Sequence, residues 1–253
     1  ELMMLGAFAG LGLMTLAGFP FWIAFVATVL AMGVFGIALE RVVIRPILGQ
    51  PAFTLVMLTI GIGYVARGLV TMIPGIGTET HTLPVPYKDQ VWHAGPLVLN
   101  VEQMVVIGAT AVLCLLLFAV FRYSKVGIAM QAASQNQLAA YYMGIPVKLI
   151  FSLIWAISAG TAAAAGILLA PVTLIDINMG LAVALKAFAA AVLGGFGSIP
   201  GALVGGIVIG LIELYAGATL PDGFKDTAPY IVLLVMLAVR PQGLFGTMTR
   251  KKV

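Results

Sequence analysis

The sequence predicts an all-α fold, a polytopic bundle of transmembrane helices, from three observations. Of its 253 residues, 62% are hydrophobic and only 9% are charged, whereas charged residues make up about 25% of a typical soluble domain. The mean hydropathy is +1.13. The apolar residues also come in long runs, and a helix needs about 20 of them to cross a bilayer. A soluble globular domain is therefore excluded.

Eight apolar segments are expected to form spans or half-spans: Leu2–Ala17, Phe19–Leu39, Phe53–Ile73, Val101–Phe121, Leu149–Ala170, Leu181–Leu193, Ala202–Leu220 and Ala228–Val239. Two of them, Leu181–Leu193 and Ala228–Val239, are short, which indicates tilted, broken or re-entrant helices. The chain starts at Glu1 without the basic region of a signal peptide. We therefore expect the N-terminal segment to be missing from this sequence, and any helix before Glu1 would change the number of spans.

The basic residues predict the orientation, because Lys and Arg collect in cytoplasmic loops. Alternate connections carry Arg41 and Arg45, then Arg122, Lys125 and Lys148, then Arg240, Arg250, Lys251 and Lys252, against the single carboxylate Glu40. This asymmetry places residues 122–148 and the C-terminus in the cytoplasm. Residues 74–100 lie on the other side, where Pro74, Pro84, Pro86 and Pro96 predict an irregular but ordered loop. That loop is either a docking site for an extracytoplasmic partner or a simple connector.

Enzymatic signatures are absent from the sequence. It contains no GxxxxGK[ST] phosphate loop, no HExxH motif and no GxSxG elbow, and its only histidines, His81 and His93, have no companion cysteine. We expect no catalytic residue, no metal site and no cofactor bound by this chain. Any ATP-driven work then needs a separate subunit. The lone Cys114 excludes a disulfide framework.

Residues 122–148 form a polar segment between long apolar runs, with three cations and no carboxylate. Its middle, Gly127–Gly144, is predicted to be a short helix, which Gly144 and Pro146 end. Two interpretations remain open. The helix is either a coupling element that a motor protein pushes from below, or an amphipathic helix resting on lipid.

Two features of the membrane region are candidates for a transport pathway. The block from Leu193 to Gly201 includes Gly194, Gly195 and Gly197, and its smooth backbone either lines a sliding pathway or serves static helix packing. Lys186, Glu213 and Arg67 are ionisable groups within apolar runs. Because a charge at membrane depth costs at least about 2.5 kcal/mol, such groups face a cavity or one another. We expect Lys186 either to extend outward to the membrane interface or to pair with Asp176 or Glu213. Glu213 is expected to lie near mid-membrane, and Arg67 to reach the outer interface rather than to line a pathway.

Several motifs resemble the permease subunits of branched-chain amino acid ABC importers, the LIV type, to which urea and amide permeases are close relatives. They are the opening Glu1–Phe8, the segments Gly127–Ala132, Ala139–Ala140 and Gly144–Ile145, the run Ala187–Ser198 with Gly201 and Gly205, and the terminal Arg240–Gly246. Ala139, Ala140 and Gly144 also fit the AA-xxx-G core of the importer coupling loop. Two residues depart from the family pattern, because Leu138 stands where that loop often has Glu and Gln131 stands where many relatives have Arg.

The resemblance implies a single transmembrane permease domain over residues 1–253, N-terminally incomplete, with one more helix expected before residue 1. It implies a multi-pass protein of a bacterial inner membrane, with a cytoplasmic coupling loop at 122–148 and an extracytoplasmic loop at 74–100. The implied coupling residues are Gly127, Gln131, Ala132, Ala139, Ala140, Gly144 and Ile145. The implied partners are a second permease, identical or homologous, two cytoplasmic ATPases that use ATP, an extracytoplasmic binding protein and membrane lipid, but no nucleic acid.

The function expected from this resemblance is inward transport of branched-chain or related amino acids. Three alternatives stay open. The cargo of such an importer could be urea or a short amide. An ion- or proton-coupled carrier would instead use Lys186, Glu213 and Arg67 as relay groups, and a passive channel or structural subunit would need no energy source.

Overall fold

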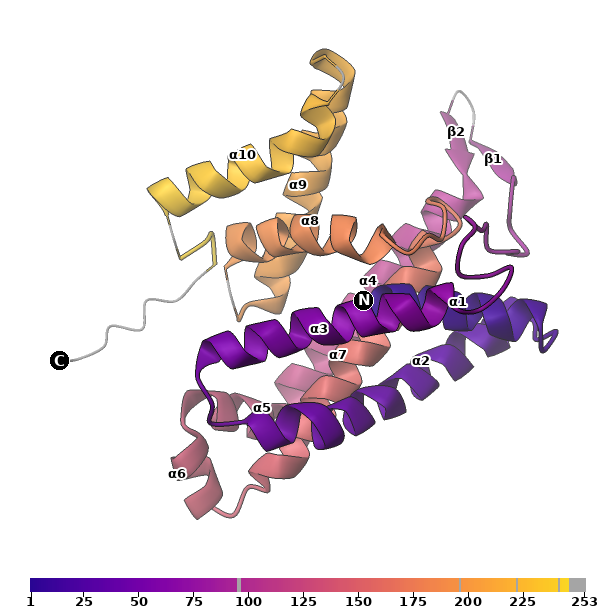
Figure 1. Ribbon diagram of the computed structural model, residues 1–253. Helices are drawn as coiled ribbons and strands as arrows, with labels where there is room; N and C mark the ends of the chain where they lie inside the picture. The colour runs from indigo at the N-terminus through magenta and orange to yellow at the C-terminus, as the bar shows by residue number, and fades with distance from the viewer. Residues whose placement is uncertain (95–96, 196, 222, 241, 246–253) are drawn as a thin grey trace. The chain divides into compact units, whose positions relative to one another are not determined.

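The protein is described by a computed structural model that covers residues 1–94, 97–195, 197–221, 223–240 and 242–245 (Figure 1). Its elements are α1 (Leu2–Thr15), α2 (Phe21–Leu39), a π-helical turn η1 (Glu40–Ile44), a 3₁₀ turn η2 (Arg45–Ile47), α3 (Ala52–Thr71), β1 (Val91–Ala94), β2 (Leu97–Asn100), α4 (Val101–Tyr123), α5 (Lys125–Gln135), α6 (Gln137–Tyr142), α7 (Val147–Leu169), α8 (Met179–Gly194), α9 (Ile199–Thr219) and α10 (Phe224–Val239).

A helix covers each of the eight predicted apolar segments, so the expected helical membrane fold is confirmed. Within the described residues, five helices are long and apolar enough to cross a membrane: Phe21–Ile47, Phe53–Thr71, Val101–Tyr123, Val147–Leu169 and Ile199–Thr219. As the sequence predicts, α8 and α10 are shorter, with 16 residues each. At 1.5 Å per residue they are about 24 Å long, less than the roughly 30 Å of a bilayer core.

The chain divides into two compact units, Glu1–Gly180 and Leu181–Val253, which are described separately. In the first unit, α7 packs along α2 and α1 (Figure 1). Small residues permit this close approach. A Cβ atom at Gly36 of α2 would lie only 2.5 Å from the Trp155 carbonyl oxygen of α7, and one at Gly6 of α1 would overlap Ala163.

The described part of residues 74–100 is less irregular than the sequence predicts. Strands β1 and β2 form an antiparallel hairpin in which Trp92 faces Leu99. Before the hairpin, His81 exchanges two backbone hydrogen bonds with Ile175, which ties this loop to the connection between α7 and α8. Tyr87 is buried, with its ring edge-on to Phe21 at 5.5 Å. Burial, with a contribution from the nearby Glu102 charge, raises the pKa of Tyr87.

The prediction of one helix over Gly127–Gly144 is wrong, because the segment folds as two helices, α5 and α6, that meet at Asn136. Asn136 has extended backbone angles, φ −154° and ψ 105°, and its side-chain oxygen accepts a hydrogen bond from the Ala139 amide at 3.0 Å. An asparagine side chain offers the backbone this local bond in place of a helical one. The polar segment is therefore a bent pair of helices.

The second unit contains α9 packed against α10, with α8 from Leu181 onward. The glycine-rich turn between α8 and α9 lets their backbones meet, because a Cβ at Gly194 would overlap Gly201 and one at Gly205 would overlap Ala190. The segment after α10 returns to this turn: the Leu244 amide donates to the Leu193 carbonyl at 2.9 Å, and the Phe245 amide donates to the Gly194 carbonyl at 3.0 Å. The two sequence motifs of this half thus form one contact.

Candidate functional site

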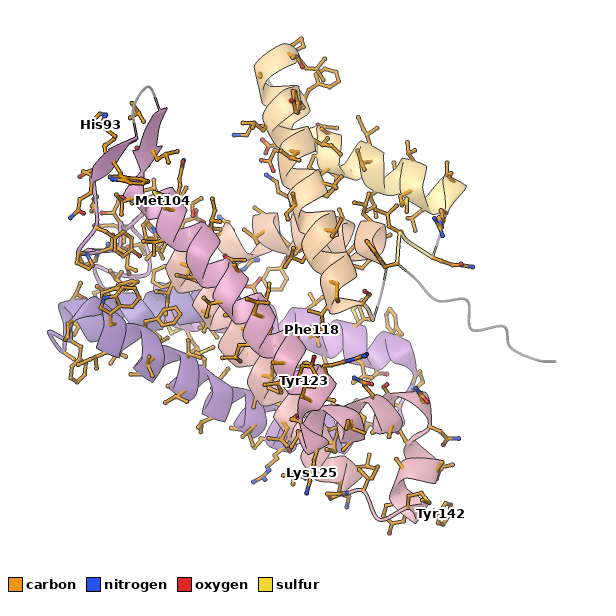
Figure 2. All side chains as sticks on the ribbon, turned by 180° about the vertical axis from the view of Figure 1, so that it is seen from behind. His93, Met104, Phe118, Tyr123, Lys125 and Tyr142 are labelled. Carbon is orange, nitrogen blue, oxygen red and sulfur yellow. The ribbon has the colours of Figure 1, made fainter. Side chains whose placement is uncertain are left out.

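The end of the first unit that carries α5 and α6 presents an exposed apolar surface, which we call the α6 patch. It consists of Leu138, Tyr141, Tyr142 and Met143, whose exposed fractions are 70%, 67%, 81% and 82%. Figure 2 shows Tyr142 at the far end of α6 and Lys125 at the start of α5. Three basic residues border the two helices in sequence: Arg122 near the end of α4, Lys125 at the start of α5 and Lys148 at the start of α7.

The opposite side of the helix pair is anchored in the bundle. Met130 and Ala133 of α5 and Ala140 of α6 form a buried cluster with Ile150 of α7. The start of α5 lies directly on the end of α4, since the Ser124 hydroxyl accepts a hydrogen bond from the Gly127 amide at 2.9 Å. A Cβ at Gly127 would overlap the Val120 carbonyl. A force applied to the α6 patch would therefore reach α7 through packed side chains.

A Schellman motif at Gly144 sets the exit from α6. The Ile145 amide donates to the Ala140 carbonyl and the Gly144 amide to the Tyr141 carbonyl, each at 3.0 Å, with Gly144 at φ +82°. Because only glycine adopts this left-handed conformation without strain, Gly144 fixes the angle between α6 and α7.

The predicted coupling residues are thus brought together on α5, α6 and the turn that follows. Gly127 and Ala140 are buried, Ala132 and Ile145 are half-buried, and Gln131, Ala139 and Gly144 are exposed. Gln131 is already engaged within the chain, since its side-chain amide donates to the Phe121 carbonyl at 3.0 Å. The exposed aromatic pair Tyr141 and Tyr142, whose rings pack edge to face with centroids 6.1 Å apart, was not among the predicted coupling residues. Two adjacent tyrosines within a polar segment were the feature of the sequence that could have indicated an exposed contact surface.

The ionisable residues of the apolar runs form ion pairs. Lys186 donates to Glu213 at 2.8 Å, as predicted, but its second partner is Asp226 of α10 at 3.2 Å rather than Asp176. Glu213 lies four residues past the centre of α9, about 6 Å toward its C-terminal end. Arg67 donates to Glu1, with its Nε 3.1 Å from each carboxylate oxygen. Each of the two cations is thus paired within its own unit, Arg67 with one anion and Lys186 with two.

The predicted pathway glycines lie in the turn between α8 and α9. Gly195 and Gly197 adopt positive φ angles of 99° and 88°, and Gly194 approaches Gly201. The close approach agrees with static packing and with a sliding surface alike, so the pathway role of these glycines stays a prediction. Phe196, Pro241, Gly246, Arg250, Lys251 and Lys252 of the predicted motifs and basic residues lie outside the described residues.

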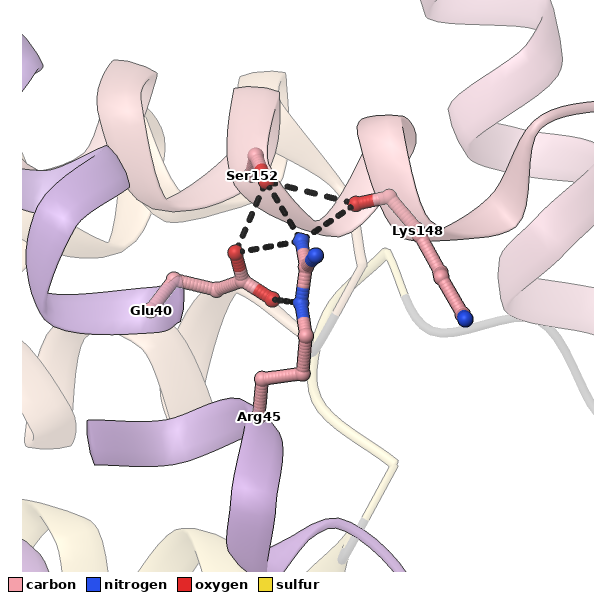
Figure 3. A network of polar contacts seen from close by, with 4 residues as sticks. All are labelled: Glu40, Arg45, Lys148 and Ser152. Atoms are coloured by element: carbon pink, nitrogen blue, oxygen red, sulfur yellow. Dashed lines mark hydrogen bonds and ion pairs between the residues drawn. The ribbon is translucent and has the colours of Figure 1, made fainter. Parts of the chain in front are cut away.

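Sequence reasoning missed a buried polar network that joins η1 to α7 (Figure 3). Glu40 and Ser152 are each only 1% exposed. Arg45 donates to both oxygens of Glu40, through Nε at 3.0 Å and Nη2 at 2.8 Å, and Nη2 also donates to the Ser152 hydroxyl at 2.9 Å and the Lys148 carbonyl at 3.2 Å. The Ser152 hydroxyl donates to Glu40 at 2.7 Å. Glu40 and Ser152 are 112 residues apart in sequence, so the only sequence signal for this network was a single carboxylate among the cations of the connections predicted to be cytoplasmic.

Comparison with known proteins agrees with this architecture. Residues 1–239 match the family described as "Branched-chain amino acid transport system / permease component". The chain is 32% identical over 257 residues to the high-affinity branched-chain amino acid transport system permease protein LivH of Escherichia coli, covering all of this chain and 80% of that protein. It is 29% identical over 233 residues to BraD of Pseudomonas aeruginosa, covering 91% of this chain and 76% of that permease.

An archaeal protein is also similar. The chain is 34% identical over 161 residues to a probable branched-chain amino acid transport permease protein LivH of Methanocaldococcus jannaschii, covering 61% of this chain and half of the relative. No solved structure matches the chain. The family match covers nearly the whole sequence, and the helices that it spans are those of a multi-pass membrane protein. The chain therefore belongs to the family of branched-chain amino acid transport system permease components.

Proposed function

We propose that this chain is the permease subunit of an ABC importer that carries branched-chain amino acids inward across a bacterial cytoplasmic membrane. The observation that carries the proposal is the similarity to LivH, which extends over all of this chain. In this proposal residues 122–148 and the C-terminus face the cytoplasm, and the loop 74–100 faces the opposite side. The chain itself binds no cofactor or metal, and ATP is used by partner subunits.

The α6 patch supports a docking role for this end of the molecule. Its four apolar side chains point away from the cluster that anchors α5 and α6, so their exposure serves no packing within the chain. Exposed aromatic side chains are typical anchors of protein interfaces. The flanking cations have no carboxylate among residues 122–148. The partner that fits is therefore an ATPase with an apolar recess and an acidic rim.

The remaining partners follow from the same assignment. A second permease, identical or homologous, completes the membrane unit, two ATPases supply the energy, and an extracytoplasmic binding protein delivers the cargo. The β1–β2 hairpin, with its exposed Trp92 and Val98, is the surface proposed for the binding protein.

The docking role is tested by Tyr142→Ala in the transporter assembled with its ATPases. Loss of one interface aromatic should weaken ATPase binding about tenfold, equal to about 1.4 kcal/mol. Tyr215→Ala is the matched control, because Tyr215 is also exposed but lies on α9. ATPase binding that is equal in the two variants would remove the α6 patch from the interface.

A second variant tests transmission rather than docking. Gly144→Val has open space around its Cβ, but valine is strained at φ +82°, so the angle between α6 and α7 must change. We expect normal membrane insertion and a loss of ATP-stimulated uptake. Uptake of leucine driven by a pH or sodium gradient, without any ATPase, would instead favour a secondary carrier that uses Lys186 and Glu213.

A further inference from the structure

Helix α7 carries two apolar stripes that engage different neighbours. Ile150, Leu153, Ile154 and Ile157 belong to the cluster that α5 and α6 enter. Ser152, Trp155, Ala156 and Ala159 face α2, where they approach Glu40, Gly36 and Gly33. The second stripe is the first one shifted by two residues, which is about 200° around a helix of 3.6 residues per turn. Helix α7 is therefore held between α5 and α6 on one side and α2 on the other.

The contact between α7 and α2 is tight along its length. Beside the near-overlap at Gly36, a Cβ at Gly33 would lie 3.5 Å from the Ala156 carbonyl oxygen, and one at Gly160 would lie 3.4 Å from the Val29 carbonyl oxygen. Such backbone contacts resist compression, but they carry no direction along the helix axis. Two smooth surfaces of this kind can slide or rotate against each other.

The network of Glu40, Arg45 and Ser152 supplies the missing direction. The Arg45 guanidinium donates hydrogen bonds to two groups of α7, the Lys148 carbonyl and the Ser152 hydroxyl. The same guanidinium also donates to both carboxylate oxygens of Glu40. Hydrogen bonds of this kind weaken steeply when their angle changes. Sliding or rotation of α7 against the end of α2 would break several of them together.

The π-helical turn is what brings the ion pair into register. Glu40 and Arg45 are five residues apart, which in an α-helix would separate their side chains by about 140°. In η1 the Arg45 amide donates to the Glu40 carbonyl, an i to i+5 bond, so the two side chains lie on the same face. Single π turns within helices are frequently found at functional positions.

We propose that Glu40, Arg45 and Ser152 act as positioning residues of the transport cycle. They lock the first turns of α7 to the end of α2, so that a displacement of α5 and α6 moves α2 together with α7. The inference rests on the proposed importer function, because it assigns the displacement to the docked ATPase. None of the three residues needs to touch the cargo.

The test compares Ser152→Ala and Arg45→Gln with the control Arg41→Gln, in the complete transporter reconstituted in vesicles with its ATPases and binding protein. Arg41 is an exposed cation four residues before Arg45. Leucine uptake and ATP hydrolysis are measured in the same preparations. We expect both network variants to assemble and to hydrolyse ATP within twofold of the parent, while leucine transported per ATP falls at least threefold. Arg41→Gln should leave this ratio unchanged.

A ratio that stays constant in both network variants would overturn the proposal. So would failure of both to assemble, since the network would then serve folding alone. A second measurement does not depend on transport: spin labels at Val34 of α2 and Leu149 of α7, both exposed, report the distance between the helices. Ser152→Ala should broaden that distance distribution, and an unchanged distribution would also overturn the proposal. Absence of ATP-dependent uptake by the parent transporter, with a broadened distribution in Ser152→Ala, would reject the importer assignment and retain the lock.

Discussion

Replacement of Gly36 by alanine tests the packing of α2 on α7. The added Cβ would lie 2.5 Å from the Trp155 carbonyl oxygen and 2.8 Å from the Ala159 Cβ, whereas ordinary contact begins at 3.4 Å. The overlap with the carbonyl oxygen is therefore about 0.9 Å. Neither obstacle is the end of a flexible side chain, so the two helices must separate. Overpacking of this kind costs about 1–3 kcal/mol.

That cost should be visible in thermal unfolding of the purified protein in detergent. For a chain of this size, 1 kcal/mol corresponds to a shift of roughly 2–4 °C in Tm, so the expected decrease is roughly 2–12 °C. Gly210→Ala is the matched control, because it is also a helical glycine but nothing lies within 4 Å of its Cβ. If the Gly36→Ala and Gly210→Ala proteins have the same Tm, the close approach of α2 and α7 is refuted.

Two further predictions concern buried polar groups. Tyr87→Phe should leave the Tm unchanged or raise it, because the Tyr87 hydroxyl is buried without a hydrogen-bond partner among the described residues and such a group costs about 1–3 kcal/mol; a clear decrease would show that the hydroxyl is bonded. Lys186→Met should destabilise the second unit because it leaves Glu213 and Asp226 without their cation, and adding Glu213→Gln should recover part of the loss. Thermal unfolding of the single and double variants measures this coupling, and strictly additive losses would contradict it.

Hydropathy located the helices of the eight apolar segments because the signal is local: each segment must supply its own apolar surface and satisfy its own backbone. The short length of α8 was visible for the same reason. The hairpin of β1 and β2 was not, since each strand has four residues, too few for an alternating pattern to be distinguished from a proline-rich loop. The break at Asn136 was also not predicted, because a single asparagine caps α6 within a segment whose other residues favour a continuous helix.

The contacts of charged residues were harder to predict, because they join elements that are distant in sequence. Charge counting assigned Glu40 and Arg45 to one connection and Lys148 to the next, which is consistent with their meeting at one end of the first unit. It could not pair Glu40 with Ser152, which is an ordinary serine in an apolar run. Lys186 could be paired with Glu213 because few anions exist in the apolar runs, but Asp226 lies outside them, two residues before the predicted segment Ala228–Val239.

The chemistry of the network favours a positioning role over a purely stabilising one. The Glu40 carboxylate is buried while the Arg45 side chain is 32% exposed, so the pair removes mainly the negative charge from water. Well-packed apolar residues of similar size often stabilise a protein as well as a buried ion pair or better. Apolar side chains at the junction of η1 and α7 would therefore be adequate if only adhesion were needed. They would not fix rotation or axial position, which the forked Arg45 does through hydrogen bonds to two sites on α7 and a third group on η1. Helices α5 and α6 pack against the other side of α7. In the proposed mechanism, a junction that fixes the rotation and axial position of α7 relative to α2 makes both helices move together when the α6 patch is displaced.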